Sequence, residues 1–166
     1  MTSADAGWLA VESLPVGLIT WYLPGGRAVA LAAAWLAVVN GQPPELRAGS
    51  PGMVEGCELL PVAGDFAVNI PAAAASLPLH ELVAAAGSPV LLAGTIGTSP
   101  ARTVHAPLLN GCAVQLECAG GRVVAGGWDA ELAGTVRLLR RGGLIIDPAA
   151  YPDLCALRPL HAVFPS

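Results

Sequence analysis

The sequence predicts a mainly β protein, an antiparallel β-barrel with two or three short helices. Two observations predict it: short segments rich in β-branched and aromatic residues recur along the chain, and pairs of glycines separate many of them. Such turns join antiparallel neighbours, whereas parallel strands need long helical crossovers. The length of 166 residues suits one domain, so we assign residues 1–166 to a single domain.

The first predicted element is a β-hairpin from Leu14 to Ala34. Leu14 to Tyr22 is rich in β-branched and aromatic residues, and Leu23-Pro24-Gly25-Gly26 has the composition of a tight turn. Arg27 to Ala34 then resumes the apolar pattern as the returning strand. The alternative is a buried helix over Ala28 to Val39, which local propensity favours because alanine is the best helix former. We predict the strand because the turn requires a returning partner.

The middle of the chain, after the break at Pro43-Pro44, is predicted to alternate between strands and short helices. The expected elements are a strand at Glu45 to Gly49, a helix within Met53 to Val62 and a strand at Asp65 to Ile70. A second helix is expected from Leu77 to Ala86, where Ser76 can cap its start and Gly87 can end it. A loop should follow from Ser88 to Pro107, with an apolar patch at Val90 to Ala93.

The last third is predicted to be a β-meander. In Cys112 to Ala119 the residues Val114, Leu116 and Cys118 share one face while Gln115 and Glu117 share the other, which is typical of a half-buried strand. The other expected elements are a turn at Gly120-Gly121, strands at Arg122 to Ala125, Glu131 to Leu139 and Leu144 to Asp147, and an irregular segment from Pro148 to Ser166.

The composition limits the classes of function. Hydrophobic residues make up 54% of the chain and charged residues 12%, so apolar surface should be buried against another chain, and we predict a homodimer. The net charge of -4 and the absence of a basic cluster argue against nucleic-acid binding. The chain has no lysine, which excludes Schiff-base chemistry and a P-loop. Met1 to Gly7 has no signal-peptide character, and the longest apolar run is too short for a membrane span, so we expect a cytoplasmic protein without membrane contact.

The cysteines and histidines show no metal-ligand spacing, so we expect no metal site. They are Cys57, Cys112, Cys118 and Cys155, with His80, His105 and His161. Cys112 and Cys118 are an even number of residues apart, which places them on one strand face but well separated along it, and this argues against a disulfide. We expect four buried free thiols. The GxSxG motif of many hydrolases is absent, and no catalytic residue can be assigned.

Four segments occur in the order and at the distances of a known family. They are Ala30 to Trp35 followed by Val38-Val39-Asn40 and Pro43-Pro44, then Gly64 to Pro71, then Ala106-Pro107-Leu108, and finally Cys112 to Cys118. Together they resemble the flavin reductase-like family, whose corresponding segments read Met-Thr-Ala-Ala/Ser-Trp, Gly-Glu-Phe-Val-Val-Asn-Ile-Pro, Ala-Pro-Leu and Cys-Pro-Val-Asn-Leu-Glu-Cys. The resemblance covers roughly residues 14 to 140.

The resemblance implies an FMN-binding split barrel of the flavoredoxin and NAD(P)H:FMN oxidoreductase type. It implies a homodimer with FMN at the interface between subunits and NAD(P)H as electron donor. Small residues would let the flat ring approach the backbone closely, and an apolar wall would favour stacking. By resemblance, the residues lining the ring would be Leu31, Ala32, Ala33, Ala34, Trp35 and Asn40, and those facing the phosphate would be Gly49, Ser50 and Gly56.

The same resemblance shows where this sequence departs from the family. The family threonine of the first segment falls on Ala32, the phosphate-contacting arginine falls on Pro51 and its threonine falls on Gly56. The family's Gly-Asp-His turn falls on Gly127-Trp128-Asp129, which has no histidine. The lost phosphate contacts predict FMN binding weakened about a hundredfold to ten-thousandfold. The alternative function is therefore a degenerate member that has lost flavin binding and serves as a non-enzymatic binding or structural dimer.

Overall fold

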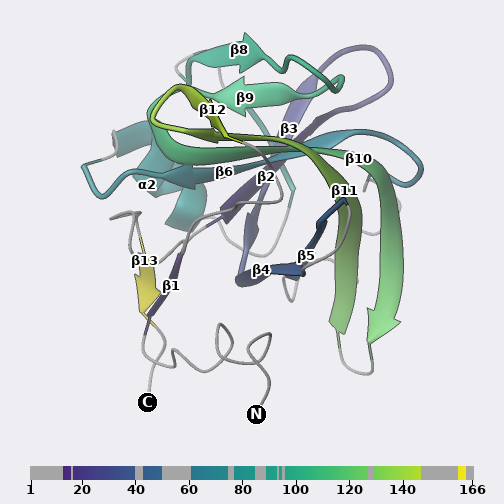
Figure 1. The fold of residues 1–166 in the computed structure, drawn as a ribbon. Helices are drawn as coiled ribbons and strands as arrows, with labels where there is room; N and C mark the ends of the chain where they lie inside the picture. Colours follow the sequence, from purple (N-terminus) through teal and green to yellow (C-terminus); the bar gives the residue numbers. More distant parts are fainter. Residues whose placement is uncertain are drawn as a thin grey trace.

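The structure is a computed structural model that describes residues 13–15, 17–39, 43–49, 61–74, 77–84, 89–92, 94, 96–126, 129–146 and 161–163. One curled sheet, half of a barrel, dominates it (Figure 1). Its strand order is β4-β5-β11-β10-β6-β2-β3-β7, with β12 beside β11. The strands of this sheet are β2 (Gly17–Tyr22), β3 (Ala28–Ala33), β4 (Trp35–Val39), β5 (Glu45–Gly49), β6 (Phe66–Pro71), β7 (Val90–Leu91), β10 (Cys112–Gly126), β11 (Asp129–Arg141) and β12 (Leu144–Ile146).

Two small sheets and one helix complete the described part. The pair β1 (Ser13–Pro15) and β13 (His161–Val163) forms one small sheet, and β8 (Thr98–Pro100) with β9 (Pro107–Leu109) forms the other. The helix is α2 (Leu77–Ala84). All strand pairings among the described residues are antiparallel, so the prediction of an antiparallel split barrel is confirmed.

The predicted hairpin is present as β2 and β3, and the alternative helix over Ala28 to Val39 is wrong. The Leu23 N–H donates to the Arg27 carbonyl oxygen (2.8 Å), which closes the turn. Gly25 and Gly26 have φ angles of 98° and 88°, which favour glycine. Every residue of β3 pairs with β2, so tertiary pairing overrides the helix propensity of alanine.

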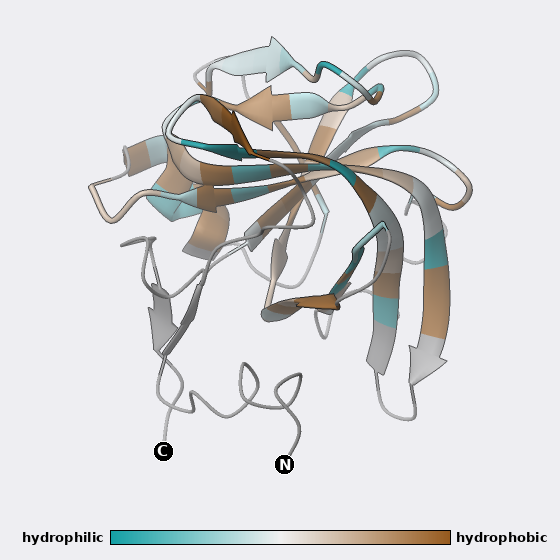
Figure 2. Ribbon diagram, viewed as in Figure 1, coloured by the Kyte–Doolittle hydropathy of each residue, from teal (hydrophilic) through white to brown (hydrophobic). Residues whose placement is uncertain are grey.

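The central strands are buried on both faces, which explains their continuous apolar runs. One face packs into the barrel core around Ile19, Trp21, Phe66, Val68 and Leu116. On the other side of the sheet, α2 covers a cluster that includes Leu18, Ala30, Ala32, Leu79 and Leu82. The segment between β8 and β9, together with β9, packs on Ala67 in a third cluster with Ala106 and Leu108. In Figure 2 the exposed strand β8 is hydrophilic, whereas hydrophobic residues gather on the strands beneath it.

The expected turn at Gly120-Gly121 is wrong. Both glycines lie inside β10, which continues to Gly126, and the pairing with β11 shifts register between Ala119 and Arg122. Gly120 has a φ of 66°, which a β-bulge with glycine accommodates. A Cβ on Gly121 would lie 2.2 Å from the Pro61 carbonyl oxygen, so this position also requires glycine for packing. The chain reverses instead between Gly126 and Asp129, which are register partners.

Other expectations on the course of the chain have mixed outcomes. The predicted loop Ser88 to Pro107 contains β7, β8 and the start of β9, and the predicted irregular tail contains β13. The strands at Glu45 to Gly49 and Asp65 to Ile70 and the helix starting at Leu77 are confirmed. Residues 53–60 of the other predicted helix lie outside the described residues, as do Ser76, Gly87 and Asp147.

Cys112 and Cys118 do not share a face, contrary to the expectation from their spacing. The pairing of β10 with β6 shifts register between Cys112 and Val114, so Cys112 packs in the cluster under α2 while Cys118 lies in the barrel core. Both are free thiols, but Cys112 is only partly buried. Burial raises the pKa of Cys112 to about 12 and raises that of Cys118 as well, so both thiols stay protonated at neutral pH. Cys57 and Cys155 lie outside the described residues.

Candidate functional site

Three of the candidate flavin-binding residues, Ala34, Trp35 and Gly49, come together where β3 passes into β4. Ala34 lies between the two strands, and its N–H donates to the Gly49 carbonyl oxygen at the end of β5 (2.7 Å). Trp35 and Gly49 are register partners. A Cβ on Gly49 would lie 2.4 Å from Cε2 of the Trp35 indole, so the indole packs directly on the glycine backbone. This contact requires glycine at position 49.

The candidate ring-lining residues differ in how far they can meet a ligand. Leu31 and Ala33 belong to the barrel core, and Ala32, which is 4% exposed, belongs to the cluster under α2. Their own chain therefore covers these three side chains. Ala34 and Trp35 are half-buried and present the surface that a flat ring could contact. Asn40, Ser50 and Gly56 lie outside the described residues.

A network of ion pairs lies beside Gly49 on the outer face of the sheet. Arg47 Nε lies 2.8 Å from a carboxylate oxygen of Glu45, and its Nη1 lies 3.5 Å from Glu131, the register partner of Gly49. Arg122 pairs with the second carboxylate oxygen of Glu45. The guanidinium of Arg122 and then that of Arg47 hold the pKa of Glu45 below its usual value against the opposing effect of burial.

This network of ion pairs makes the surface beside Gly49 a poor binding site for a phosphate group. Arg47 lies two residues before Gly49 on β5, and both it and Arg122 already have carboxylate partners. The two arginines and two glutamates balance in charge, so the surface offers no net positive potential. The described residues therefore fit the ring of a flavin at Ala34 and Trp35 better than they fit its phosphate.

Asn69, within the family-like Asn-Ile-Pro segment, is wholly structural in this chain. Its side chain is 0% exposed, and its amide donates to the Leu18 carbonyl oxygen (3.0 Å) and to the Thr20 hydroxyl (2.9 Å). Its amide oxygen accepts from the Leu109 N–H (2.9 Å) and from the Gln115 amide (3.2 Å). Asn69 thus joins β2, β6, β9 and β10, and its hydrogen-bonding groups are used within the chain.

Glu117 is a second buried polar residue, although the strand pattern placed it on the less buried face. Its Oε1 accepts from the N–H groups of Arg102 (3.0 Å) and Thr103 (2.6 Å) and from the Thr103 hydroxyl (2.8 Å). Arg140 Nε lies 3.3 Å from Oε2. Burial opposes ionisation, but these donors together hold the pKa of Glu117 below its usual value. Glu117 therefore fixes the segment between β8 and β9 onto the sheet.

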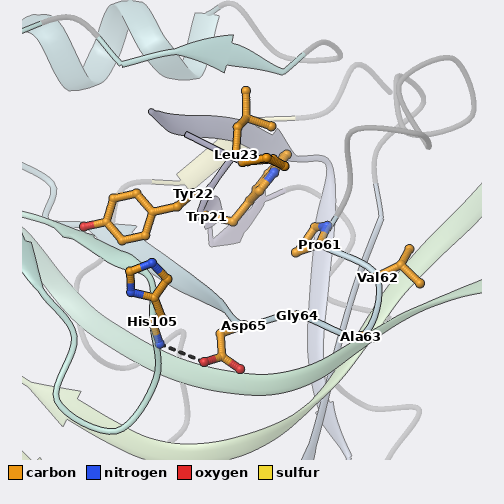
Figure 3. Close-up of a pocket in the computed structure, with 10 residues that line it drawn as sticks. Trp21, Tyr22, Leu23, Pro61, Val62, Ala63, Gly64, Asp65 and His105 are labelled. Atoms are coloured by element: carbon orange, nitrogen blue, oxygen red, sulfur yellow. Dashed lines mark hydrogen bonds between the residues drawn. The ribbon is translucent and has the colours of Figure 1, made fainter. Parts of the chain in front are cut away.

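A pocket of about 710 Å³ opens at the other end of the β2–β3 hairpin. It lies between the hairpin turn, the segment before β6 and the segment between β8 and β9 (Figure 3). Its described lining residues are Trp21, Tyr22, Leu23, Pro24, Pro61, Val62, Ala63, Gly64, Asp65 and His105. None of the candidate flavin-binding residues is among them. No sequence pattern predicts this pocket, because its residues converge only through the strand pairing.

The polar groups of this pocket are Asp65, His105 and Tyr22. Asp65 Oδ2 accepts a hydrogen bond from the His105 N–H (2.7 Å). The rings of Tyr22 and His105 pack with centroids 4.7 Å apart at an interplanar angle of 34°. A carboxylate here would repel a phosphate, and the described lining residues include no arginine. The pocket is therefore a poor place for the phosphate of a flavin.

The described residues contain neither a metal-ligand cluster nor a membrane-spanning helix. No group of three or more histidine, cysteine, aspartate or glutamate side chains lies close enough there to hold a metal ion. No described helix is long and apolar enough to cross a membrane.

Solved structures with the same fold match most of the chain, whereas no protein-family model and no curated protein matches the sequence. The flavoredoxin of Methanosarcina acetivorans has a TM-score of 0.65 at 22% identity, covering 95% of this chain and 84% of that one. The NADH:FAD oxidoreductase of Streptomyces globisporus C-1027, in complex with NAD and FAD fragments, has a TM-score of 0.64 at 20% identity, covering 91% and 89%.

A third match is a chain of Sinorhizobium meliloti 1021 assigned as an oxidoreductase, with a TM-score of 0.66 at 18% identity. The match covers 87% of the present chain but 49% of that one, so the present chain spans about half of its length. Similarity at these identities establishes the fold and leaves function to be argued from the site. The chain has the split-barrel fold of the flavin reductase-like proteins.

Proposed function

We propose that the protein is a flavin-binding redox protein of the flavin reductase type, which holds FMN with its ring against Ala34 and Trp35 and uses NAD(P)H as electron donor. A bound flavin would supply the chemistry, by accepting a hydride and passing electrons onward. The observation that carries the proposal is the packing of Trp35 on Gly49 within a split barrel. The Trp35 indole would offer a flat aromatic surface to the ring, and Trp35 is one of the residues that line the ring according to the sequence resemblance.

The chain's own residues would bind and orient the ring. The Trp35 indole offers a half-buried aromatic face, and the Ala34 methyl group leaves room beside it. The Ala34 N–H donates to the Gly49 carbonyl oxygen, and this bond helps to hold the passage from β3 to β4 in place. The core positions of Leu31 and Ala33 support this segment from behind.

The paired arginines predict weak recognition of the flavin phosphate. A phosphate at Gly49 would have to draw Arg47 away from Glu45 and Glu131, so the gain would be offset by the two ion pairs lost. We therefore expect the ring to dominate binding. Riboflavin, which lacks the phosphate, should bind within about tenfold of FMN, an energy difference of about 1.4 kcal/mol or less.

A homodimer is part of the proposal, and the edge strand β4 supports it. β4 pairs only with β5 among the described strands, and all its residues are apolar and at least partly exposed, including Val39 at 38%. An apolar edge strand is a liability unless another segment or another chain covers it. A second copy would cover β4 beside Trp35, which would place the ring site at the interface. Light scattering coupled to size-exclusion chromatography should give twice the 16.7 kDa chain mass.

The test of flavin binding is an absorption spectrum between about 350 and 500 nm, followed by titration with FMN and riboflavin. We expect yellow protein or saturable binding of both flavins. Trp35→Ala should weaken both about equally, whereas Trp35→Phe, which keeps an aromatic face, should retain most of the affinity. Colourless protein that ignores about 1 mM of either flavin would contradict the proposal.

One observation favours the second candidate, a degenerate split barrel that acts as a non-enzymatic binding or structural dimer. Three of the candidate ring-lining side chains are covered by their own chain, and the cations beside Gly49 are already paired. This candidate predicts a dimer that binds neither flavin. The same titration together with the mass measurement separates the two functions. Free thiols at Cys112 and Cys118 suit the cytoplasm, where we place either function.

A further inference from the structure

The pocket at the turn of the β2–β3 hairpin is formed by other residues than Ala34 and Trp35, the proposed contact surface for the flavin ring. β2 and β3 run side by side, with Tyr22 opposite Ala28 at the pocket end and Gly17 opposite Ala33 at the flavin end. The pocket therefore lies one hairpin length away from Ala34 and Trp35. An inference about it does not depend on whether flavin binds.

The pocket walls are held in place by main-chain hydrogen bonds. The Ala63 N–H donates to the Gly121 carbonyl oxygen (2.6 Å), and the Gly121 N–H donates to the Gly64 carbonyl oxygen (2.9 Å). Ala63 has a φ of 61°, a left-handed conformation that is costly for a residue with a side chain. On the opposite side, the bonds of Glu117 to Arg102 and Thr103 fix the segment that presents His105. The pocket is thus formed before any ligand arrives.

The chemistry of the lining is anionic, aromatic and apolar. Figure 3 shows Tyr22 and His105 on one side, Pro61 and Val62 on the opposite side, and Asp65 between them at the base. Asp65 is the only carboxylate among the described lining residues. One of its oxygens accepts the His105 N–H, and no described cation forms an ion pair with it.

We propose that this pocket binds a small organic cation, a primary ammonium group attached to an aromatic or aliphatic body. The ammonium group would donate to Asp65 and lie beside the aromatic face of Tyr22, an arrangement that favours cations. The body would lie against Leu23, Pro61 and Val62, whose apolar surface suits a hydrocarbon group. The volume of about 710 Å³ lies within the usual range of small-molecule sites.

The charge of the ligand is the discriminating property, so the test compares three probes of similar shape. They are 2-phenylethylamine, the neutral 2-phenylethanol and the anionic 3-phenylpropionate. Binding would be followed by two-dimensional NMR, in which the amide signals of Ala63, Gly64 and His105 report on the pocket. We expect the amine to bind about tenfold to a hundredfold more tightly than the alcohol, and the acid to bind more weakly than either. Equal binding of amine and alcohol, or no binding of the amine at about 10 mM, would overturn the proposal.

Two variants assign the effect to this pocket. Asp65→Asn keeps an oxygen that can accept the His105 N–H but removes the charge, and it should bring amine and alcohol to equal affinity. Val62→Arg adds a cation at a side chain that is 60% exposed, where folding is not at risk, and its charge should weaken binding of the amine by a larger factor than binding of the alcohol. The matched control is Glu81→Gln, which removes an exposed acid from α2 away from the pocket. Unchanged preference for the amine in both pocket variants refutes the assignment, whatever the flavin titration shows.

Discussion

Replacement of Glu117 by glutamine should destabilise the protein by about 3–4 kcal/mol. The carboxylate is 0% exposed and accepts three hydrogen bonds from Arg102 and Thr103 on one oxygen. The amide oxygen of glutamine would retain them as neutral bonds, each weaker by about 1 kcal/mol. The amide NH₂ would face the Arg140 guanidinium, so that ion pair would be lost, at about 1 kcal/mol or less because Arg140 is partly exposed.

Thermal unfolding followed by circular dichroism measures this effect. For a chain of this size, 3 kcal/mol lowers Tm by about 6–12 °C. Glu81→Gln is the control, since Glu81 is exposed on α2 and its replacement should change stability by about 0.5 kcal/mol or less. If Glu117→Gln lowers Tm by less than about 2 °C, the buried carboxylate does not hold the segment between β8 and β9 as described.

Three further predictions concern acidity, packing and thiol reactivity. Because the folded-state pKa of Glu117 lies below its usual value of 4.5, its contribution to the free energy of unfolding should be complete above that pH and be lost as the pH falls below it. Urea unfolding at several pH values should therefore show that Glu117→Gln loses less stability on acidification than the wild type does. An identical loss of stability in the two proteins would refute the assignment. Gly121→Ala should destabilise the fold by more than about 2 kcal/mol, since its Cβ would lie 2.2 Å from the Pro61 carbonyl oxygen, and a variant as stable as wild type in urea would contradict that contact. Burial raises the pKa of Cys112 to about 12, so iodoacetamide at a pH of about 8 should leave the Cys112 peptide unlabelled in the native protein. Peptide mass spectrometry measures the labelling. Labelling as fast as in denaturant would show that the thiol is accessible.

Local sequence chemistry predicted those elements whose determinants are local. The hairpin of β2 and β3 follows from the Pro-Gly-Gly turn, and the structure shows that turn closed by its own main-chain bonds. The helix starting at Leu77 and the strand at Phe66–Pro71 likewise follow from short-range patterns. In each case the residues that decide the element lie within or next to it.

The errors arose where pairing between distant segments decides the outcome. Gly120-Gly121 has the composition of a turn, but glycines also occupy bulges, and only the pairing with β11 distinguishes the two. A similar register shift after Cys112 moves that thiol to the other face from Cys118, which no spacing rule could anticipate. The strand pattern places Glu117 on the less buried face because the Arg102 N–H that caps its carboxylate lies 15 residues earlier in the chain, outside the strand that the pattern describes.

In the candidate site, too, local sequence predicted some features, whereas others depend on distant segments. The family-like segment predicted the neighbourhood of Ala34 and Trp35, and the structure brings them against Gly49 through the pairing of β4 with β5. Residue identity could not show that Leu31 and Ala32 are covered by their own chain, because coverage depends on the core and on α2. The pocket around Asp65 and His105 joins residues 40 positions apart. Asp65 lies in the family-like segment Gly64 to Pro71, but no sequence pattern links that segment to His105.

The bulge in β10 makes the chain sensitive to changes in length at one point. Before the bulge, β10 pairs with both β6 and β11. Beyond it, β10 pairs with β11, while β11 pairs with β5 and β5 pairs with β4. Loss of a single residue between Ala119 and Arg122 would exchange the inner and outer faces of the last part of β10, and Arg122 would turn away from Glu45. Relatives of this protein should therefore tolerate insertions between Gly126 and Asp129, the end of β10 and the start of β11, far more readily than at the bulge. At the bulge, a change of one residue would alter both the lining of the barrel and its charged exterior.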